Sequence, residues 1–229
     1  MSKITELTRN DISKSPPKPF NMKKEGYNDI FPMTVHGYEI RYKKNTFRPR
    51  EKILSVWDGN TGAAVLMISP VMYQGVRAYE IGSVALNPAY QGQQLGYELY
   101  KGLVVLMGIN LISLDSHSPG ASKLWARLSR DPKISAYGID VENRIVFNVR
   151  SNKRGSELKS SKKGTSIYSD DPYEDNMIGL IMVKRASNDD VKLSKLLKNN
   201  KKKNVPDSSK PDMNQSDVFG ITKYDPIDS

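Results

Sequence analysis

Hydrophobic positions along the chain recur at two spacings, and each spacing predicts one kind of element. Apolar residues that alternate with polar ones, or form short runs, predict strands. These strands are expected over residues 38–42, 52–57, 63–69, 79–86, 110–115, 144–150 and 177–185. Apolar positions three and four apart predict helices over residues 95–107, 118–128 and 189–199.

The order of these elements predicts the fold class. A turn-forming segment at 58–62 joins the second and third strands as a hairpin, and the seventh strand is expected to return and pair with the sixth. A front half rich in hairpins followed by alternating strands and helices is typical of a mixed sheet. We therefore predict an α/β fold with a mixed, mostly antiparallel central sheet and flanking helices.

The polar stretches predict the domain organisation. Residues 1–34 are expected to form a flexible N-terminal arm, since the proline-rich run at 15–19 cannot be helical. Residues 35–185 are expected to form one compact domain that contains a basic, flexible loop at 151–166. Residues 186–229 are expected to form a polar, disordered C-terminal tail outside the short helix.

Composition excludes several classes of site. The 229 residues include no cysteine and two histidines, so disulfides, thiolate nucleophiles and a three-histidine zinc site are excluded, and no metal site is predicted. No apolar stretch reaches the length of a membrane span, so we expect a cytoplasmic protein without membrane association. The net charge of +10 favours anionic partners without specifying which.

One segment combines features that suit an anionic ligand. The predicted strand at 79–86 ends in Asn87-Pro88, and a loop rich in glutamine and glycine then leads into the helix at 95. Such a loop directs backbone N–H groups and the positive end of a helix dipole to one point, which favours a pyrophosphate. An ordinary strand-to-helix turn is the alternative.

This segment resembles the pyrophosphate loop of the GNAT superfamily, the Gcn5-related N-acetyltransferases. In that family a Val-x-Val-x-Pro strand precedes Gln/Arg-x-x-Gly-x-Gly/Ala, and here the six residues read Gln-Gly-Gln-Gln-Leu-Gly over 91–96, with Gln94 in place of the first glycine. The segment 114–128 resembles the family's next helix, with Ser118 at the pantetheine-contacting position and Trp125 where a tyrosine acid is common. It is similar to a divergent branch of GNAT-like proteins common in bacteriophages.

The resemblance implies an acyl-CoA-dependent N-acetyltransferase that transfers an acetyl group directly from acetyl-CoA to an amine. It places Glu80 as the base that deprotonates the amine, and His117 lies beside the expected substrate cleft as a second candidate. The main-chain N–H groups near Ala85 and Leu86 would polarise the thioester carbonyl. The implied acetyl-CoA contacts are Val84, Ala85, Leu86, Gln91, Gly92, Gln93, Gln94, Leu95, Gly96 and Ser118.

Two alternatives remain open. Gln94, Trp125 and the long tails favour a GNAT fold without catalysis that serves as a binding or virion component. The basic segment 41–52, with aromatic residues interleaved, favours a nucleic-acid-binding protein. The amine acceptor is a protein or a small molecule. The family resemblance is compatible with a homodimer, and a phage-encoded protein would reside in the host cytoplasm or in the virion.

Overall fold

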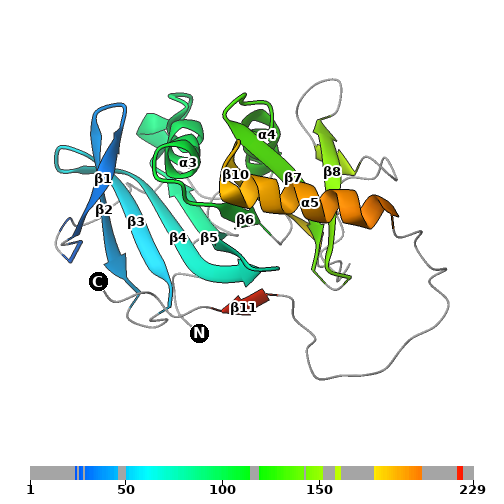
Figure 1. The fold of residues 1–229 in the computed structure, drawn as a ribbon. Coiled ribbons are helices and arrows are strands. Elements are labelled where there is room, and N and C mark those ends of the chain that lie inside the picture. Colours follow the sequence, from blue (N-terminus) through cyan, green and yellow to red (C-terminus); the bar gives the residue numbers. More distant parts are fainter. Residues whose placement is uncertain are drawn as a thin grey trace. The chain divides into compact units, whose positions relative to one another are not determined.

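The computed structural model describes residues 24, 26–27, 29–45, 50–113, 119–141, 143–151, 158–160, 178–202 and 221–223. Hydrogen bonding orders their strands as β1-β2-β3-β4-β5-β6-β10-β7-β8-β9, and β11 pairs with β4. Every pairing with a recorded register is antiparallel except that of β5 with β6, which is parallel. The predicted class, an α/β fold with a mixed and mostly antiparallel sheet, is therefore confirmed (Figure 1).

The chain divides into two compact units. The first contains the described residues up to Pro70 together with Ile81–Gly102, and the second contains Val71–Glu80 and the described residues from Leu103 to Lys223. The strand β5 contributes to both units, because the division falls between Glu80 and Ile81. Residues 35–185, which were expected to form one compact domain, are divided between the two units.

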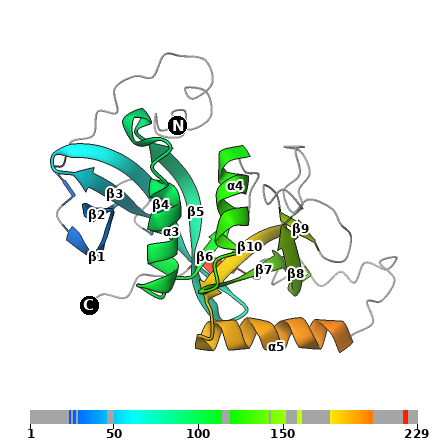
Figure 2. The ribbon, with the colours of Figure 1, turned by 90° about the horizontal axis from the view of Figure 1, so that it is seen from above.

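The first unit is built on a meander of strands and one helix. Its elements are β1 (Asp29–Val35), β2 (Tyr38–Lys44), β3 (Lys52–Asp58), most of β4 (Thr61–Tyr73), the end of β5 (Val76–Leu86), the 3-10 helix η1 (Pro88–Tyr90) and most of α3 (Leu95–Val105). The helix lies against the sheet of this unit (Figures 1 and 2). It buries Leu95 and Leu99, which the helical period predicted on one face, and also Tyr100, whereas Leu106, predicted on the same face, lies beyond the helix end and is exposed.

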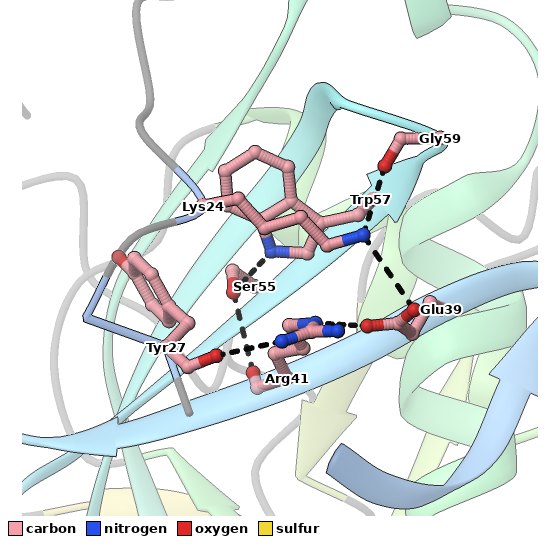
Figure 3. Close-up of polar contacts among 7 residues, drawn as sticks. All are labelled: Lys24, Tyr27, Glu39, Arg41, Ser55, Trp57 and Gly59. Atoms are coloured by element: carbon pink, nitrogen blue, oxygen red, sulfur yellow. Dashed lines mark hydrogen bonds and ion pairs between the residues drawn. The ribbon is translucent and has the colours of Figure 1, made fainter. Parts of the chain in front are cut away.

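The other face of this sheet carries a smaller apolar cluster held by polar contacts (Figure 3). Tyr27 packs edge-on against Trp57, with ring centroids 5.9 Å apart, and the indole Nε1 donates to Ser55 Oγ over 2.7 Å. Arg41 donates to the main-chain oxygen of Tyr27 and to the carboxylate of Glu39, and the latter bond holds the pKa of Glu39 below its usual range. These contacts fix the backbone at Tyr27 to the sheet.

The structure has a strand ahead of the predicted domain start at residue 35. β1 lies within the stretch predicted to be a flexible arm, where Met33 and Val35 are buried. Pro32 interrupts the alternation and coincides with a register shift between Ile30 and Thr34, so the sequence pattern of β1 is irregular. Proline at an edge strand also removes a donor that another chain could pair with.

The second unit packs the remaining strands around a separate core. Its elements are β6 (Leu111–Ser113), α4 (Pro119–Leu128), β7 (Ile134–Asp140), β8 (Ile145–Ser151), β9 (Leu158–Ser160), β10 (Ile178–Lys184), α5 (Asn188–Lys202) and β11 (Ile221–Lys223). Tyr73, Ile139 and Ile181 are fully buried in this core, against which Leu193 of α5 packs.

The structure contradicts the predicted pairing of the last two strands. β10 pairs with β6 and β7 instead of β8, because the unpredicted strand β7 lies between β10 and β8. The short strand β9 lies inside the segment predicted to be a flexible loop at 151–166, and β11 lies inside the predicted tail. The helix expected at 189–199 is present as α5 and is longer at both ends.

Two side-chain hydrogen bonds to aspartates fasten α5 to its unit. Asn110 Nδ2 donates to Asp189 Oδ2 over 2.7 Å, and the Tyr137 hydroxyl donates to Asp190 Oδ1 over 2.6 Å. Both aspartates lie in the first turn of α5, where negative charge is favoured by the helix dipole. No helix among the described residues is long and apolar enough to span a membrane.

Candidate functional site

The loop between β5 and α3 is anchored to the start of β4 by Asn87. Its main-chain N–H donates to Ala63 O over 2.9 Å, and its side-chain Nδ2 donates to Gly62 O over 2.8 Å. The same side chain accepts a bond from Ala89 N over 3.1 Å and so caps the 3-10 helix η1. The residue that ends the strand therefore also fixes where the loop begins.

Tyr90 fixes the middle of the loop through contacts to Asp58 and Tyr38. Its hydroxyl donates to Asp58 Oδ2 over 3.0 Å, and its buried ring meets Tyr38 edge-on at a centroid distance of 5.7 Å. Burial, with the hydrogen bond to Asp58, raises the pKa of Tyr90. The phenol therefore stays protonated and remains a donor at neutral pH.

Sequence reasoning missed Tyr90 and Asp58 as site-forming residues. Asp58 lies in a segment that predicts only a turn, and Tyr90 lies in a loop with no helical or strand periodicity. Neither pattern indicates a contact between two residues that are 32 positions apart. The available signal was weak: a tyrosine is an unusual choice in a loop otherwise made of small and polar residues.

Beyond Tyr90 the backbone enters the left-handed region twice. Gly92 has φ +81° and Gln94 has φ +61°. This conformation favours glycine and costs other residues about 1–2 kcal/mol. Gln94 occupies the position where the GNAT-type pattern has its first glycine, so the backbone here has the conformation that glycine suits, although the residue is glutamine.

The side chains of the loop leave its surface open. Gln91, Gly92, Gln93 and Gln94 are all exposed, and a Cβ atom built at Gly92 would meet nothing within 4 Å. The next side chain, Leu95, is buried beneath the helix and is 1% exposed. The loop therefore presents backbone and amide groups to a ligand, with an apolar anchor below them.

The first turn of α3 supplies backbone donors. Its first α-helical hydrogen bond runs from Glu98 N to Gln94 O over 3.1 Å, so the N–H groups of Leu95 and Gly96 precede the ladder and are directed at the loop. Residues 87–98 contain no lysine or arginine, and Glu98 is acidic. Attraction for an anion would thus come from N–H groups and the helix dipole alone.

The end of β5 forms an edge of the first unit's sheet among the described strands. The parallel pairing with β6 comprises Tyr79 with Leu111 and Glu80 with Ile112, so among the described strands the segment Ile81–Leu86 has a neighbour, β4, on one side only. Val84 is 39% exposed on this edge, and Ala85 and Leu86 are half-buried.

Two hydrogen bonds show that the alternation of β5 shifts. Tyr79 N donates to Asn110 O on the β6 side, whereas Asn87 N donates to Ala63 O on the β4 side. Residues an even number apart in a regular strand direct their N–H groups to the same side, so one irregularity lies between them.

The structure places the other predicted site residues as follows. Val84, Ala85, Leu86 and the loop residues 91–96 belong to the first unit, where they form the end of β5 and the start of α3. Glu80 is half-buried on β5 in the second unit. His117 and Ser118 lie outside the described residues.

Trp125, which stands where the resembled family often has a tyrosine acid, is 1% exposed on α4. A buried indole is a structural residue, and its N–H is too weak an acid to protonate a thiolate. Among the described residues there is also no group of three His, Asp or Glu side chains that could hold a metal ion.

Comparison with known proteins gives limited information. No family model matches the chain, and no curated protein matches it. Among solved structures, a putative GNAT-family acetyltransferase from Bacteroides thetaiotaomicron matches with a TM-score of 0.32 and 10% identity, covering 64% of this chain and 70% of that one. A likeness of this size says nothing about the residues of the site.

Proposed function

We propose that the protein is an acyl-CoA-dependent N-acetyltransferase that transfers an acetyl group from acetyl-CoA to an amine. The observation that carries the proposal is the conformation of the β5–α3 loop. Left-handed backbone at Gly92 and Gln94 precedes a helix start with two outward-directed N–H groups. This arrangement fits a pyrophosphate, which needs several N–H donors and room for close approach.

Residues of this chain would bind three parts of the acetyl-CoA donor: the pyrophosphate, the pantetheine arm and the thioester. The N–H groups of Leu95 and Gly96 would bind the pyrophosphate, with Gln91 and Gln93 as amide donors at the rim. The open edge of β5 would bind the amide groups of the pantetheine arm as a strand binds its neighbour. The main-chain N–H groups near Ala85 and Leu86 would orient the thioester carbonyl. Bound acetyl-CoA would supply the activated acetyl group.

Glu80 is the proposed proton acceptor from the substrate ammonium. It lies on the strand whose end forms the donor site, and its half-buried position leaves a carboxylate within reach of solvent. His117 remains a second proposed acceptor, and Ser118 a proposed contact to pantetheine. The absence of cysteine from the sequence agrees with direct attack of the amine on the thioester, without a cysteine acyl-enzyme.

A second function is supported by Trp125. Because this buried side chain replaces the common acid, the fold would bind acyl-CoA or another partner without transferring the acetyl group. Binding of acyl-CoA is compatible with both functions, but only the first includes transfer of the acetyl group. A phage-type origin is proposed with either function, and a binding role in a virion belongs to the second.

Radiolabelled acetyl-CoA incubated with lysine-containing peptides, polyamines and free protein N-termini tests the first function. Transfer of label to an amine, lowered at least tenfold in Glu80→Gln and unchanged in Asp29→Asn, is the expected result. Asp29→Asn is the control, since it removes one exposed carboxylate of β1 that belongs neither to the proposed base nor to the proposed donor site. Binding of acetyl-CoA without transfer to any amine class would favour the second function.

A further inference from the structure

Two lysines face each other at the end of the β2–β3 hairpin. Lys44 and Lys52 are directly opposed Cα partners, the first exposed and the second half-buried. Like charges in this position destabilise a sheet. None of the described acidic side chains forms an ion pair with either lysine, and the two ion pairs found in the described part of the chain both use Glu39. No ion pair within this part of the protein therefore offsets the repulsion.

Two aromatic rings lie beside this pair. Tyr42 shares a face of β2 with Lys44, because residues two apart in a strand point to the same side. The Lys52 ammonium lies 5.4 Å from the centroid of the Tyr42 ring, and Phe31 meets the same ring edge-on at 6.2 Å. Both rings are half-buried and so keep part of their surface accessible. We name Phe31, Tyr42, Lys44 and Lys52 the lysine–tyrosine patch.

The charges around the patch are mainly positive. Arg50 flanks it in sequence, whereas Lys43 lies on the opposite face of β2, where it is held over the ring of Tyr27 at 4.2 Å. Two carboxylates border it: Asp29 is the Cα partner of Tyr42, and Glu51 accepts a bond from Asn45 Nδ2 over 2.9 Å. Three cationic side chains, Lys44, Arg50 and Lys52, thus stand against two anionic ones.

We propose that the lysine–tyrosine patch binds single-stranded nucleic acid. A phosphate between Lys44 and Lys52 would relieve their repulsion, and an unpaired base would stack on the accessible part of Tyr42. Basic residues beside stacking rings are the combination that single-stranded nucleic acids require. An acidic peptide would use the ammonium groups and leave the rings without a role. This surface consists of residues other than those of the proposed acetyl-CoA site.

Fluorescence anisotropy of a labelled oligothymidine with the full-length protein tests the charge contribution. Lys44→Gln/Lys52→Gln is expected to weaken binding about tenfold or more and to reduce the steepness of log K against log salt by about 0.7 for one lost phosphate. The control Lys195→Gln/Lys198→Gln removes the same charge from exposed positions of α5 and is expected to change affinity less than twofold. Equal losses in both double variants would overturn the proposal, as would no loss in either.

A second comparison tests the stacking contribution. Tyr42→Leu is expected to weaken oligothymidine binding about fivefold or more, whereas Tyr42→Phe, which keeps the ring, retains it. Thermal unfolding establishes that each variant is folded, and removal of the Lys44/Lys52 repulsion is expected not to lower the midpoint. Tighter binding to duplex DNA than to the single strand, or equal binding of phosphatidylserine vesicles through the same lysines, would contradict the assignment.

Discussion

The hydroxyl of Tyr90 donates a 3.0 Å hydrogen bond to Asp58 Oδ2 and so joins the turn after β5 to the turn between β3 and β4. Asn87 makes the corresponding connection to Gly62 at the other end of the same turn. The loop that enters α3 is thus held at two points before its backbone becomes left-handed. Its conformation is set by residues that would not themselves touch a ligand.

Tyr90→Phe should lower the free energy of unfolding by about 0.5–1.5 kcal/mol, because it removes one hydrogen bond to a charged acceptor that water reaches. It should also weaken acetyl-CoA binding by loosening the loop. Tyr38→Phe is the matched control: the edge-on ring contact is kept, and no hydrogen bond of the Tyr38 hydroxyl is found among the described residues. Denaturant unfolding of both variants measures the difference, and equal stabilities would argue against the anchoring role.

Gln94→Gly should raise the free energy of unfolding by about 0.5–1 kcal/mol. Glycine removes the cost of φ +61°, which exceeds the entropy that glycine adds to the unfolded chain. Gln93→Gly, where φ is not positive, should lower stability instead. Chemical denaturation should give changes of opposite sign in the two variants, and changes of the same sign would contradict a left-handed conformation at Gln94.

The raised pKa of Tyr73 predicts that the protein loses stability at alkaline pH. Burial raises the pKa of this phenol from 10.0 to about 12, so the unfolded chain releases the proton first as the pH rises. The associated stability is complete below pH 10 and is lost as the pH rises toward 12; it amounts to about 2–3 kcal/mol. Tyr73→Phe should flatten that decline.

The same variant should also be less stable at neutral pH, because the Tyr73 hydroxyl lies 3.2 Å from the carbonyl oxygens of Asp140 and Ile145 and accepts a bond from Gln74. Unfolding free energies measured from pH 8 to 12 separate the two effects. An unchanged alkaline slope in Tyr73→Phe would show that another group titrates.

Gly138→Ala should destabilise the second unit by about 1–3 kcal/mol. Gly138 and Phe147 are directly opposed on β7 and β8, and a Cβ atom at Gly138 would overlap the Phe147 ring. Phe147→Leu alone costs apolar contacts, but combined with Gly138→Ala it should recover part of the loss. A double-mutant cycle by thermal unfolding measures this coupling, and strict additivity would contradict the contact.

Regular periodicity determined which elements were predictable. The helix at α3 and the β3–β4 hairpin follow from apolar spacing and a turn-forming segment, and both are present. β1 was missed because Pro32 and a register shift break its alternation, and β7 because its apolar positions, Ile134, Tyr137 and Ile139, are unevenly spaced. Without β7, the pairing of β10 could only be assigned to the wrong neighbour.

The sequence predicted where the candidate loop lies, but it did not predict the backbone conformation and the side-chain contacts that form the loop. A strand that ends in Asn-Pro, followed by Gln and Gly residues and a helix, located the loop between β5 and α3. The left-handed Gln94 could not be predicted, because glutamine has no preference for that conformation. The bond from Tyr90 to Asp58 depends on tertiary packing, which no local pattern encodes.

Thermal unfolding with and without acetyl-CoA tests the central claim most directly. Acetyl-CoA at 100 times its dissociation constant should stabilise the protein by about 2.7 kcal/mol and raise the midpoint by about 5–10 °C. Gly96→Asp should abolish the shift, since its carboxylate would repel the pyrophosphate while suiting the helix N-terminus, and the isosteric Gly96→Asn should retain most of it. The absence of any shift at millimolar acetyl-CoA in the unsubstituted protein would contradict an acyl-CoA site at this loop.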